Sequence, residues 1–534
     1  MKKLLSILVM LAMVLSFAAA SAESIVTPAG QLPIVTEPYT LRVAVPTDAK
    51  VENIKETKLT QWLEETTGIT LEFIELSTSD TATQVNMMMN SGDLPDVFLG
   101  YDFPYDALCS YVDAGLILPV DEYVAEYASE EGYKRFLNEF PLENPEAYVT
   151  VDGQMYAVLA GGAMVTNIYA SNGIRLQDQF LQTLGLEDPQ TLEEFYNYLV
   201  AVRDNDVNGN GDPNDEVPLT SHTATYWGKN LLRAIGTAYQ YTEPNDFLKN
   251  NNGTIEFVAN NDLFKETVLF LKKLVDEKLL EPAAFTQDAM TLASRQQGEA
   301  PVFGAYAVGN SSDGFDTSSE NYKSVIYCPP LEGPYGYRAT NYNAPYVCRT
   351  KVITTACEHP EVAFRLCDFL LTEEASVAFR VGFEGSEWEK AAEGELGRNG
   401  EQAKYKLLKP QEWIQPTTNV IWNNENVTFA NTMNFVYEAP DSPTGRVVAN
   451  LKRANFQAYM TNEYMPALLM DIETSAEYAE LQKLIADYVN ENVALFVLGE
   501  KDMAEWDKYV AELDAMGVEQ YVKMAQEAYD AMFK

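Results

Sequence analysis

The sequence predicts an α/β protein built from more than one lobe. The chain has 534 residues, which is more than a single hydrophobic core usually serves. Within residues 41–100, short apolar runs alternate with stretches whose apolar residues recur at helical spacing. Strands that alternate with helices in this way are typical of a parallel sheet flanked by helices.

The first elements can be read directly from this region. Three apolar runs are predicted strands: "LRVAVP" at 41–46, "ITLEFIEL" at 69–76 and "DVFLG" at 96–100. Residues 59–66 and 82–89 are predicted helices, and Gly68 stands where a helix often ends in a left-handed residue. The segment 100–106, "GYDFPYD", follows the third strand at its carboxyl end, where open α/β sheets bind ligands.

Helical patterns dominate the rest of the chain. Thr191 and Glu194 form a capping box at the start of a helix that continues to residue 206. Pro360 occupies the first turn of another predicted helix. Residues 260–282 show apolar spacing of three and four, and the tail from residue 473 is almost entirely helical with a break at Gly499.

The charge balance narrows the classes of partner. The chain carries 37 basic and 79 acidic residues, a net charge of -42. This balance argues against nucleic acid or anionic membrane as a partner bound through bulk charge. It suits an exported protein with a strongly solvated acidic surface.

The N-terminus predicts export. Lys2 and Lys3 precede an apolar run at residues 4–17 that is too short to span a bilayer comfortably, and "ASA" at 20–22 is a small-residue cleavage site. We therefore expect residues 1–22 to be a signal peptide and residues 23–38, which contain Pro and Thr without periodicity, to be a flexible tether. An uncleaved signal anchor is the alternative.

The five cysteines do not predict a disulfide framework. They are Cys109, Cys328, Cys348, Cys357 and Cys367. Cys357 and Cys367 flank one predicted helix, which separates their Cα atoms by about 15 Å, too far for a bond. A Cys328–Cys348 bond stays open, but buried free thiols are the expectation.

Catalytic motifs are scarce. The chain has two histidines, His222 and His359, and neither lies in a nucleophile-elbow or zinc-protease context. A glycosidase that uses a carboxylate pair stays open, because among 79 acidic residues some pair will always lie close together.

The segment "DVNGNGDPNDEV" at 206–217 has the spacing of a calcium loop. Counting Asp206 as position 1, Asn208 and Asn210 supply oxygens at positions 3 and 5, and Gly211 permits the sharp turn at position 6. Asp212 at position 7 offers its backbone carbonyl. An EF-hand would place Glu at position 12, but here Glu216 stands at position 11. A helix precedes the loop and an extended segment follows it, so we expect a bound Ca²⁺ to fix the helix exit rather than to take part in chemistry.

Candidate ligand-binding residues are aromatic or lie at the end of the third strand. Sugars require aromatic faces for the apolar side of the ring and polar groups for the hydroxyls. Trp413 and Trp422 lie in irregular segments and are weaker candidates. The predicted ligand-binding residues are Tyr101, Asp102, Trp227, Tyr306, Tyr342 and Trp388.

The chain resembles a known family along nearly its whole length. The motifs are "WLEETTGITLEF", "MMMNSGDLPDVFLG", "DGQMYAV", the stretch from residue 174 to 220, "KKLVDEKLLEP", "ITTACEHPEVAFRLCDFLLTEEAS", "GFEGSEWE" and the stretch from residue 496 to 531, in that order. They are similar to those of the extracellular solute-binding proteins of carbohydrate ABC importers (family 1), in particular the long, lipoprotein-type subgroup that is similar to alginate-binding periplasmic proteins.

The resemblance implies a two-lobed, periplasmic-binding-protein-like fold of type II. Each lobe would be a mostly parallel sheet flanked by helices, with an oligosaccharide or sugar-like solute bound in the cleft between them. The implied segments are 39–155 for the first lobe, 156–343 for the second lobe, 344–395 for the return to the first lobe, and 396–534 for the second lobe with the C-terminal helices. Permease subunits of an importer would be the partners of a monomeric binding protein, which would not be an enzyme.

The resemblance also implies a structural calcium ion. Its ligands, carried over by motif position, are Asp206, Asn208, Asn210, the Asp212 carbonyl, Asp215 and Glu216, with Asn214 as the alternative to Asp215. The chain departs from the family at Gln179–Phe180, where Asp–Trp is usual, and it has no cysteine before Cys109 to serve as a lipobox. If that Trp contacts sugar in the family's other members, the first departure implies a different sugar specificity. A receptor for a non-sugar solute with the same fold is a further alternative.

Overall fold

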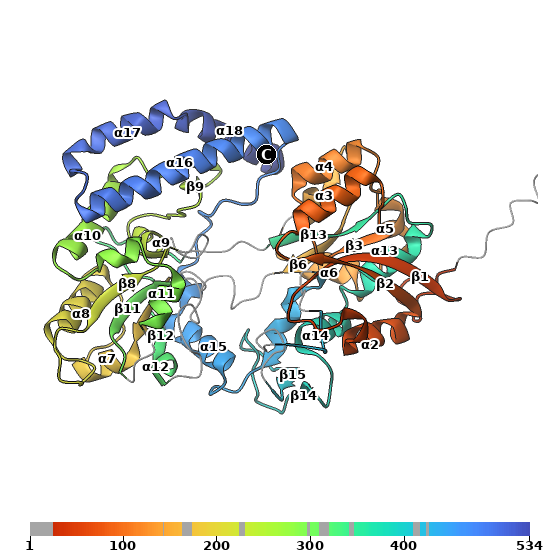
Figure 1. Ribbon diagram of the computed structural model, residues 1–534, viewed down its shortest axis with the longest axis horizontal. Coiled ribbons are helices and arrows are strands. Elements are labelled where there is room, and N and C mark those ends of the chain that lie inside the picture. The colour runs from red at the N-terminus through yellow and green to blue at the C-terminus, as the bar shows by residue number, and fades with distance from the viewer. Residues whose placement is uncertain are drawn as a thin grey trace, which may run out of the picture.

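The computed structural model consists of two lobes that lie side by side (Figure 1). Their buried apolar side chains form two large, separate clusters, one around the strands of each lobe. The structure describes residues 25–142, 144–162, 173–223, 230–295, 300–308, 320–340, 346–409, 417–422 and 427–534. The predicted signal peptide lies outside these residues.

The first lobe is organised around a five-stranded sheet in the order β2–β1–β3–β13–β6. Its strands are β1 (Tyr39–Thr47), β2 (Ile69–Ser77), β3 (Val97–Leu99), β6 (Val158–Gly162) and β13 (Tyr346–Ile353). β1 pairs in parallel with β2 and β3, whereas β13 runs antiparallel to both β3 and β6. The α/β arrangement predicted from residues 41–100 is confirmed.

The helices of the first lobe cover this sheet. In α2, the Thr57 side chain accepts a hydrogen bond from the Thr60 amide at the start, and Gly68 adopts φ 75° at the end, as left-handed caps do. Leu59 and Leu63 on one face of α2 are buried. The helices are α2 (Lys58–Thr67), α3 (Thr81–Ser91), α4 (Tyr105–Asp113), α5 (Asp121–Tyr127), α6 (Tyr133–Glu139), α13 (Pro360–Phe369) and α14 (Glu373–Val381).

The second lobe has a four-stranded sheet in the order β12–β7–β11–β8. Its strands are β7 (Gly173–Gln177), β8 (Val217–Ser221), β11 (Phe303–Val308) and β12 (Val325–Tyr327). β8 is parallel to β11, and β7 is antiparallel to both of its neighbours. Among the described strands, β8 is therefore an edge strand, with β11 as its one sheet neighbour.

The helices of the second lobe include the C-terminal ones, which lie above the sheet in Figure 1. α10 packs against α16, α18 packs against the β9–β10 hairpin, and α16 also reaches α4 of the first lobe. The elements are α7 (Asp178–Leu184), α8 (Leu192–Asp204), α9 (Asn230–Gly236), β9 (Leu248–Asn251), β10 (Thr254–Phe257), α10 (Asp262–Asp276), α11 (Ala289–Ser294), α12 (Glu320–Lys323), α15 (Pro443–Ala454), α16 (Ile472–Leu498), α17 (Trp506–Ala515) and α18 (Val518–Phe533).

Short elements complete the two lobes. A small sheet, β14–β15–β16, lies below the first-lobe sheet in Figure 1. The short elements are η1 (Ile54–Glu56), η2 (Pro145–Val149), β4 (Thr150–Val151), β5 (Gln154–Met155), η3 (Pro282–Phe285), β14 (Trp388–Lys390), β15 (Tyr405–Leu407), η6 (Ala430–Phe435), β16 (Val436–Tyr437), η7 (Phe456–Tyr459) and η8 (Met503–Glu505).

The boundaries between the lobes differ from those implied by the sequence. β6 pairs with β13, so the first lobe continues to residue 162 rather than ending at 155. The described residues within 396–409, 417–422 and 427–437 also remain with the first lobe, because β15 pairs with β14 and η6 packs against α14. The chain then crosses to the second lobe between β16 and α15.

The predicted tether, residues 23–38, is packed rather than free where it is described. Ile34 and Val35 are buried, and Val26 pairs with Val35 in an isolated bridge. Arg365 donates hydrogen bonds to the carbonyls of three residues between 27 and 31. The segment is therefore part of the first lobe.

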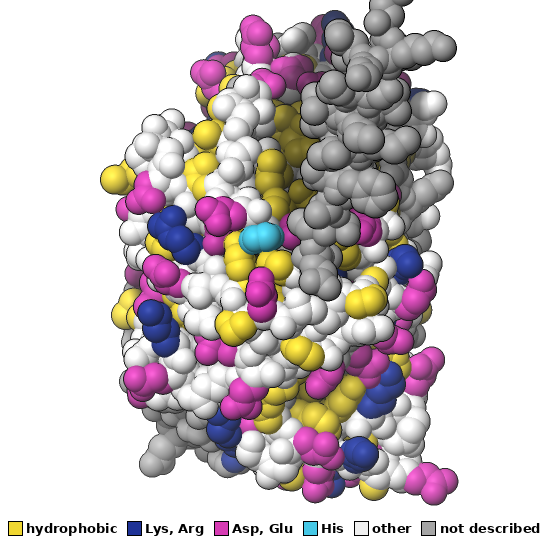
Figure 2. Space-filling model, turned by 90° about the vertical axis from the view of Figure 1, so that its right-hand side faces the viewer, with side chains coloured by type: hydrophobic (Ala, Val, Ile, Leu, Met, Phe, Trp, Pro, Cys, Tyr) yellow, Lys and Arg dark blue, Asp and Glu magenta, His cyan; other side chains and the backbone are white. Residues whose placement is uncertain are grey.

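The remaining general expectations concern thiols, surface charge and membrane spans. All five cysteines are free, and four of them are buried. On the face of the first lobe drawn in Figure 2, acidic side chains are spread among isolated Lys and Arg side chains, in keeping with the acidic composition. Among the described residues, no helix combines the length and apolar character needed to cross a bilayer.

Lys351 yields a prediction about stability. This residue of β13 is fully buried, and its Nζ donates to the Cys367 and Val427 carbonyls over 3.4 and 3.3 Å. Burial lowers the pKa of Lys351 from 10.5 to about 7. Below pH 7 both the folded and unfolded states carry the proton, so the buried charge lowers the free energy of unfolding by its full amount. Above 10.5 both are neutral, and the cost disappears.

We therefore expect Lys351→Met to raise the free energy of unfolding at pH 6.5, by at most about 5 kcal/mol. The gain over wild type should shrink as the pH rises from 7 towards 10.5. Urea unfolding at several pH values measures it. Lys483→Met, at a side chain that is 79% exposed, is the control and should show no such pH dependence. A gain that is independent of pH would contradict the interpretation.

Candidate functional site

The candidate site lies where the carboxyl ends of strands from both sheets meet the crossings, which are the chain segments that connect the two lobes. In the first lobe, β1, β2 and β3 end at one edge of the sheet. β6 ends at this edge too, and the register Tyr346↔Gly162 places the start of β13 beside it. The chain leaves the first lobe after Gly162 and re-enters it at Tyr346, so this edge is turned towards the second lobe (Figure 1).

Tyr101 and Asp102 stand at this edge, immediately after β3. Asp102 Oδ1 accepts a hydrogen bond of 2.8 Å from the backbone N–H of Arg349 on β13. Arg349 Nε in turn donates to the Phe103 carbonyl. The loop after β3 is thereby fixed to the neighbouring strand, with the Asp102 side chain still 46% exposed.

The environment of Tyr101 keeps its hydroxyl protonated. The ring is half-buried and packs edge-on against Phe103 at a centroid distance of 4.8 Å. Burial, and then the neighbouring Asp102 carboxylate, raise the pKa of Tyr101. The hydroxyl is therefore a neutral hydrogen-bond donor and acceptor beside a carboxylate, a combination that suits a hydroxyl-rich ligand.

The facing edge of the second lobe is defined by three strands. β8 ends at Ser221 and β11 at Val308, and the register pairs Val308 with Gly173 at the start of β7. The crossing that leaves the first lobe after residue 162 therefore enters the second lobe at this edge. Two predicted ligand residues, Trp227 and Tyr342, lie outside the described residues.

Tyr306 and Trp388 are placed away from the facing edges. Tyr306 on β11 is fully buried, and its hydroxyl lies 3.3 Å from Gln177 Oε1. Every side chain of β11 is buried, so Tyr306 belongs to the interior of the second lobe. Trp388 lies in the small sheet, where it packs against Tyr405 and donates to the Gly382 carbonyl over 2.9 Å. Trp422 is also buried.

The sequence interpretation missed two residues at the first-lobe edge. Tyr346, the first residue of β13, is 39% exposed. Arg349 anchors the loop that carries Tyr101 and Asp102. Neither belongs to a recognisable motif, because their role depends on the pairing of β13 with β3, about 250 residues apart in the chain. The only local signal is their position on an apolar strand that follows a Pro/Asn segment.

The predicted calcium loop lies between α8 and β8, at the opposite end of β8 from Ser221. Its side-chain oxygens fold inwards onto the backbone. Asp206 accepts from the amides of Gly209 and Gly211 over 2.8 and 2.9 Å, and Asn210 Oδ1 accepts from the Asp212 amide over 2.7 Å. Gly211 has φ 90°, which only glycine adopts without strain.

The loop has the oxygen chemistry that Ca²⁺ requires. The Asn208 and Asn210 amides both converge on the Asp215 carboxylate. Glu216 Oε1 accepts from the Val207 amide, whereas Glu216 Oε2 is buried without a hydrogen-bond partner among the described residues. Burial raises the pKa of Glu216. An orphaned buried carboxylate oxygen beside Asp and Asn oxygens fits a hard cation.

No group of three His, Cys, Asp or Glu side chains close enough to hold a metal ion occurs in the part of the chain that the structure describes. The donor set predicted for the loop contains three carboxylates together with two Asn amides and the Asp212 backbone carbonyl, and the described structure does not gather the three carboxylates into such a group. The carboxylates of Asp206, Asp215 and Glu216 are thus distributed around the loop rather than gathered into one cluster.

Comparison with known proteins identifies the family. Residues 44–377 match the family model of the bacterial extracellular solute-binding proteins. The chain belongs to this family. Its members are binding proteins rather than enzymes, and the two lobes with facing strand ends are the arrangement that such proteins share.

Individual relatives agree over most of their length. The fructooligosaccharide ABC transporter substrate-binding protein FusA of Streptococcus pneumoniae is 26% identical over 486 residues, which are 89% of this chain and 87% of FusA. A structure of an HMO-binding, ABC-transporter-associated solute-binding protein of Bifidobacterium longum infantis shares the fold, with TM-score 0.73, 20% identity, and coverage of 93% of this chain and 99% of that one. A FusA EF-hand mutant in complex with fructo-nystose has TM-score 0.67, 22% identity, and coverage of 92% and 99%.

Proposed function

We propose that this protein captures an oligosaccharide between its lobes outside the cell membrane and delivers it to the permease of an ABC importer. The observation that carries the proposal is the pair of facing strand-end edges, joined by the crossings between the lobes. FusA, a relative over nearly the whole chain, is a fructooligosaccharide-binding protein. The export of the protein through the segment 1–22, and its action as a monomer, belong to the same proposal.

The geometry suggests what the chain's own residues do. Asp102 uses Oδ1 to bind the Arg349 amide, which leaves Oδ2 to accept from a sugar hydroxyl. Tyr101 offers a protonated hydroxyl and part of a ring face next to it. Rotation of the lobes about their crossings would close the second-lobe edge over this pair and exclude water. The closed form would then be the one that docks on the permease.

A sugar panel tests the proposal. Isothermal calorimetry against mono- and oligosaccharides, including nystose, should reveal binding to at least one oligosaccharide. Tyr101→Ala should weaken that binding about tenfold or more, because a stacking and hydrogen-bonding partner is lost. Tyr335→Ala, at a tyrosine that is 63% exposed, is the matched control and should bind as wild type does. Failure to bind any sugar, or release of product from a polysaccharide by the purified protein, would contradict the proposal.

We also propose that the loop at 206–216 binds Ca²⁺ as a structural support. Asp206, Asn208, Asn210, the Asp212 carbonyl, Asp215 and Glu216 would hold the ion, with Asn214 as the alternative to Asp215. The orphaned Glu216 Oε2 supports this assignment. The relative FusA carries an EF-hand, and a mutant of that EF-hand was solved with fructo-nystose bound. Bound calcium would neutralise the carboxylates that tie the end of α8 to the start of β8.

Removal of calcium should therefore affect stability more than recognition. We expect EDTA to lower the melting temperature by several degrees, whereas the dissociation constant for a sugar changes less than about threefold. Asp206→Ala should abolish the difference between calcium and EDTA. Asp212→Ala should retain it, because that residue contributes a backbone oxygen. Differential scanning calorimetry with and without calcium measures the melting temperatures, and isothermal calorimetry measures the sugar affinity. A large loss of sugar affinity with an unchanged melting temperature would place the ion in the binding site instead.

A further inference from the structure

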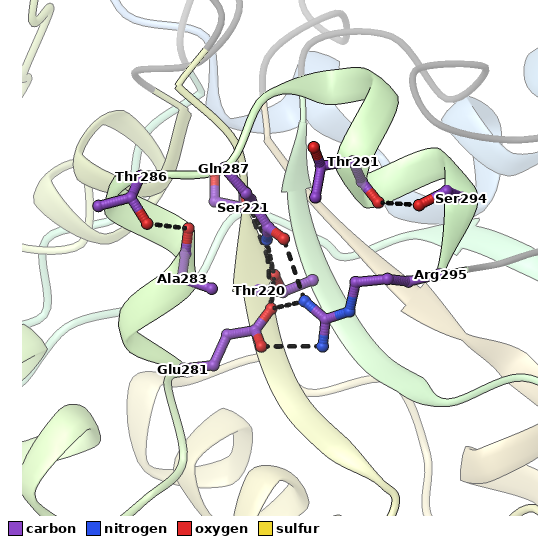
Figure 3. A network of polar contacts seen from close by, with 9 residues as sticks. All are labelled: Thr220, Ser221, Glu281, Ala283, Thr286, Gln287, Thr291, Ser294 and Arg295. Carbon is purple, nitrogen blue, oxygen red and sulfur yellow. Dashed lines mark hydrogen bonds and ion pairs between the residues drawn. The ribbon is translucent and has the colours of Figure 1, made fainter.

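A polar cluster on the second lobe lies directly below its ligand-facing edge. Figure 3 shows it: the Glu281 carboxylate, the Gln287 amide and the Arg295 guanidinium point towards one another across the end of β8. Arg295 Nη1 and Nη2 donate to Glu281 Oε1 and Oε2 over 2.8 and 3.0 Å. This is the paired geometry in which Arg–carboxylate contacts are strongest and most directional. We call the three residues the β8 clamp.

The clamp satisfies the polar groups at the end of β8. Thr220 Oγ1 donates to Glu281 and accepts from Gln287 Nε2 over 2.8 Å. The same Nε2 donates to the Ser221 carbonyl over 2.7 Å. Thr220, Ser221 and His222 are all buried. Buried groups of this kind are costly to leave unpaired, so the clamp fixes where the strand ends.

The clamp acts on the open side of an edge strand. β8 has one sheet neighbour, β11, and on its other side the only described backbone pairing is a single bridge between Leu219 and Leu280. One residue further along β8, at Thr220, the contacts on this side come from the side chains of Glu281 and Gln287 instead of from the backbone. The Gln287 carbonyl also accepts from the Thr223 amide over 2.9 Å. The path of the chain out of β8 is thus held by Gln287 at both Ser221 and Thr223.

Arg295 connects the clamp to α11, the helix that it directly follows. Its Nη1 also donates to Gln287 Oε1 over 3.0 Å. Its guanidinium lies 4.9 Å from the ring centroid of Phe303, the first residue of β11. The side chain of Met290 on α11 is 82% exposed. One arginine therefore sets the position of α11, with its exposed methionine, relative to the exit of β8.

We propose that the β8 clamp is a positioning device for sugar binding: Arg295, Glu281 and Gln287 hold the exit of β8 and α11 in the arrangement that receives the solute. None of the three needs to touch the sugar, because their polar groups are directed at each other and at Thr220 and Ser221. This inference rests on the proposed function for its binding readout, but the fixed strand exit can be tested without a sugar.

The test compares two ion pairs of similar exposure in the second lobe, one beside each outer strand of the sheet, β8 and β12. Arg295→Met breaks the clamp, whose Arg and Glu side chains are 34% and 17% exposed. Arg453→Met is the control: it removes an arginine that pairs with Asp188, a pair whose side chains are 44% and 14% exposed, and also with Asp178. Arg295→Lys keeps the charge but not the paired geometry, and is the milder variant if Arg295→Met folds poorly.

The first readout is hydrogen–deuterium exchange of the peptide that spans Thr220–Thr223 in the full chain, without sugar. We expect exchange at least about tenfold faster in Arg295→Met, an intermediate effect in Arg295→Lys and none in Arg453→Met. The second readout is the dissociation constant for nystose, which should rise about tenfold in Arg295→Met but not in Arg453→Met, at equal melting temperature.

The outcomes separate this inference from the proposed function. Unchanged exchange in Arg295→Met would overturn the inference whatever the sugar does. Faster exchange with an unchanged nystose affinity would also overturn it, since the exit of β8 would then not matter for binding. If wild-type protein does not bind nystose, the same comparison is made with the oligosaccharide from the panel that binds. If none binds, the proposed function fails, and the exchange data alone decide whether the clamp fixes the strand.

Discussion

The reversed strand β13 is the constraint on which the proposed ligand site depends. β13 runs antiparallel between β3 and β6, so its first residue lies at the edge where the parallel strands end. A chain that re-entered the sheet in the parallel direction would start at the opposite edge. Because β6 ends and β13 begins at one edge, the crossings leave from the same side as Tyr101 and Asp102. The topology alone therefore turns the carboxyl ends of the strands towards the second lobe.

Side-chain contacts then convert this topology into a fixed surface. A loop after a strand is free to move unless its backbone is bonded elsewhere. Here the Asp102 carboxylate accepts from the Arg349 amide and the Arg349 side chain donates to the Phe103 carbonyl, so the loop becomes an extension of β13. Asp102 thus has a structural oxygen and a free one. On the proposed function, the same carboxylate would both fix the loop and bind the solute.

Features that depend on neighbouring residues could be predicted from the sequence. Apolar runs predict β1, β2 and β3 because apolar side chains within each run are buried in the folded lobe. The Asp/Asn/Gly spacing predicts the loop before β8. Pairings between distant segments leave no such trace: β6 was assigned to the wrong lobe because its partner β13 lies almost 190 residues away. Arg365 binds backbone carbonyls of residues 27–31, which any sequence offers, so the packed N-terminal segment looked like a tether. Tyr306 had a readable signal, since its strand "FGAYAV" is uniformly apolar and therefore buried on both faces.

β8 lies between the two sites of the proposals, the calcium loop at its start and the clamp at its exit. As an edge strand it lacks half of the pairing that holds an inner strand, and polar groups support it at both ends. At its start, the carboxylates and amides of the loop at 206–216 join it to α8; at its exit, Glu281, Gln287 and Arg295 hold Thr220 and Ser221. The five residues of β8 span roughly 15 Å, so the two supports do not touch each other. The loop lies where β8 meets α8, whereas the clamp lies at the edge that faces the first lobe. The two ends of β8 are thus held by different side chains, and on the proposed roles the start would support calcium binding and the exit would support solute binding.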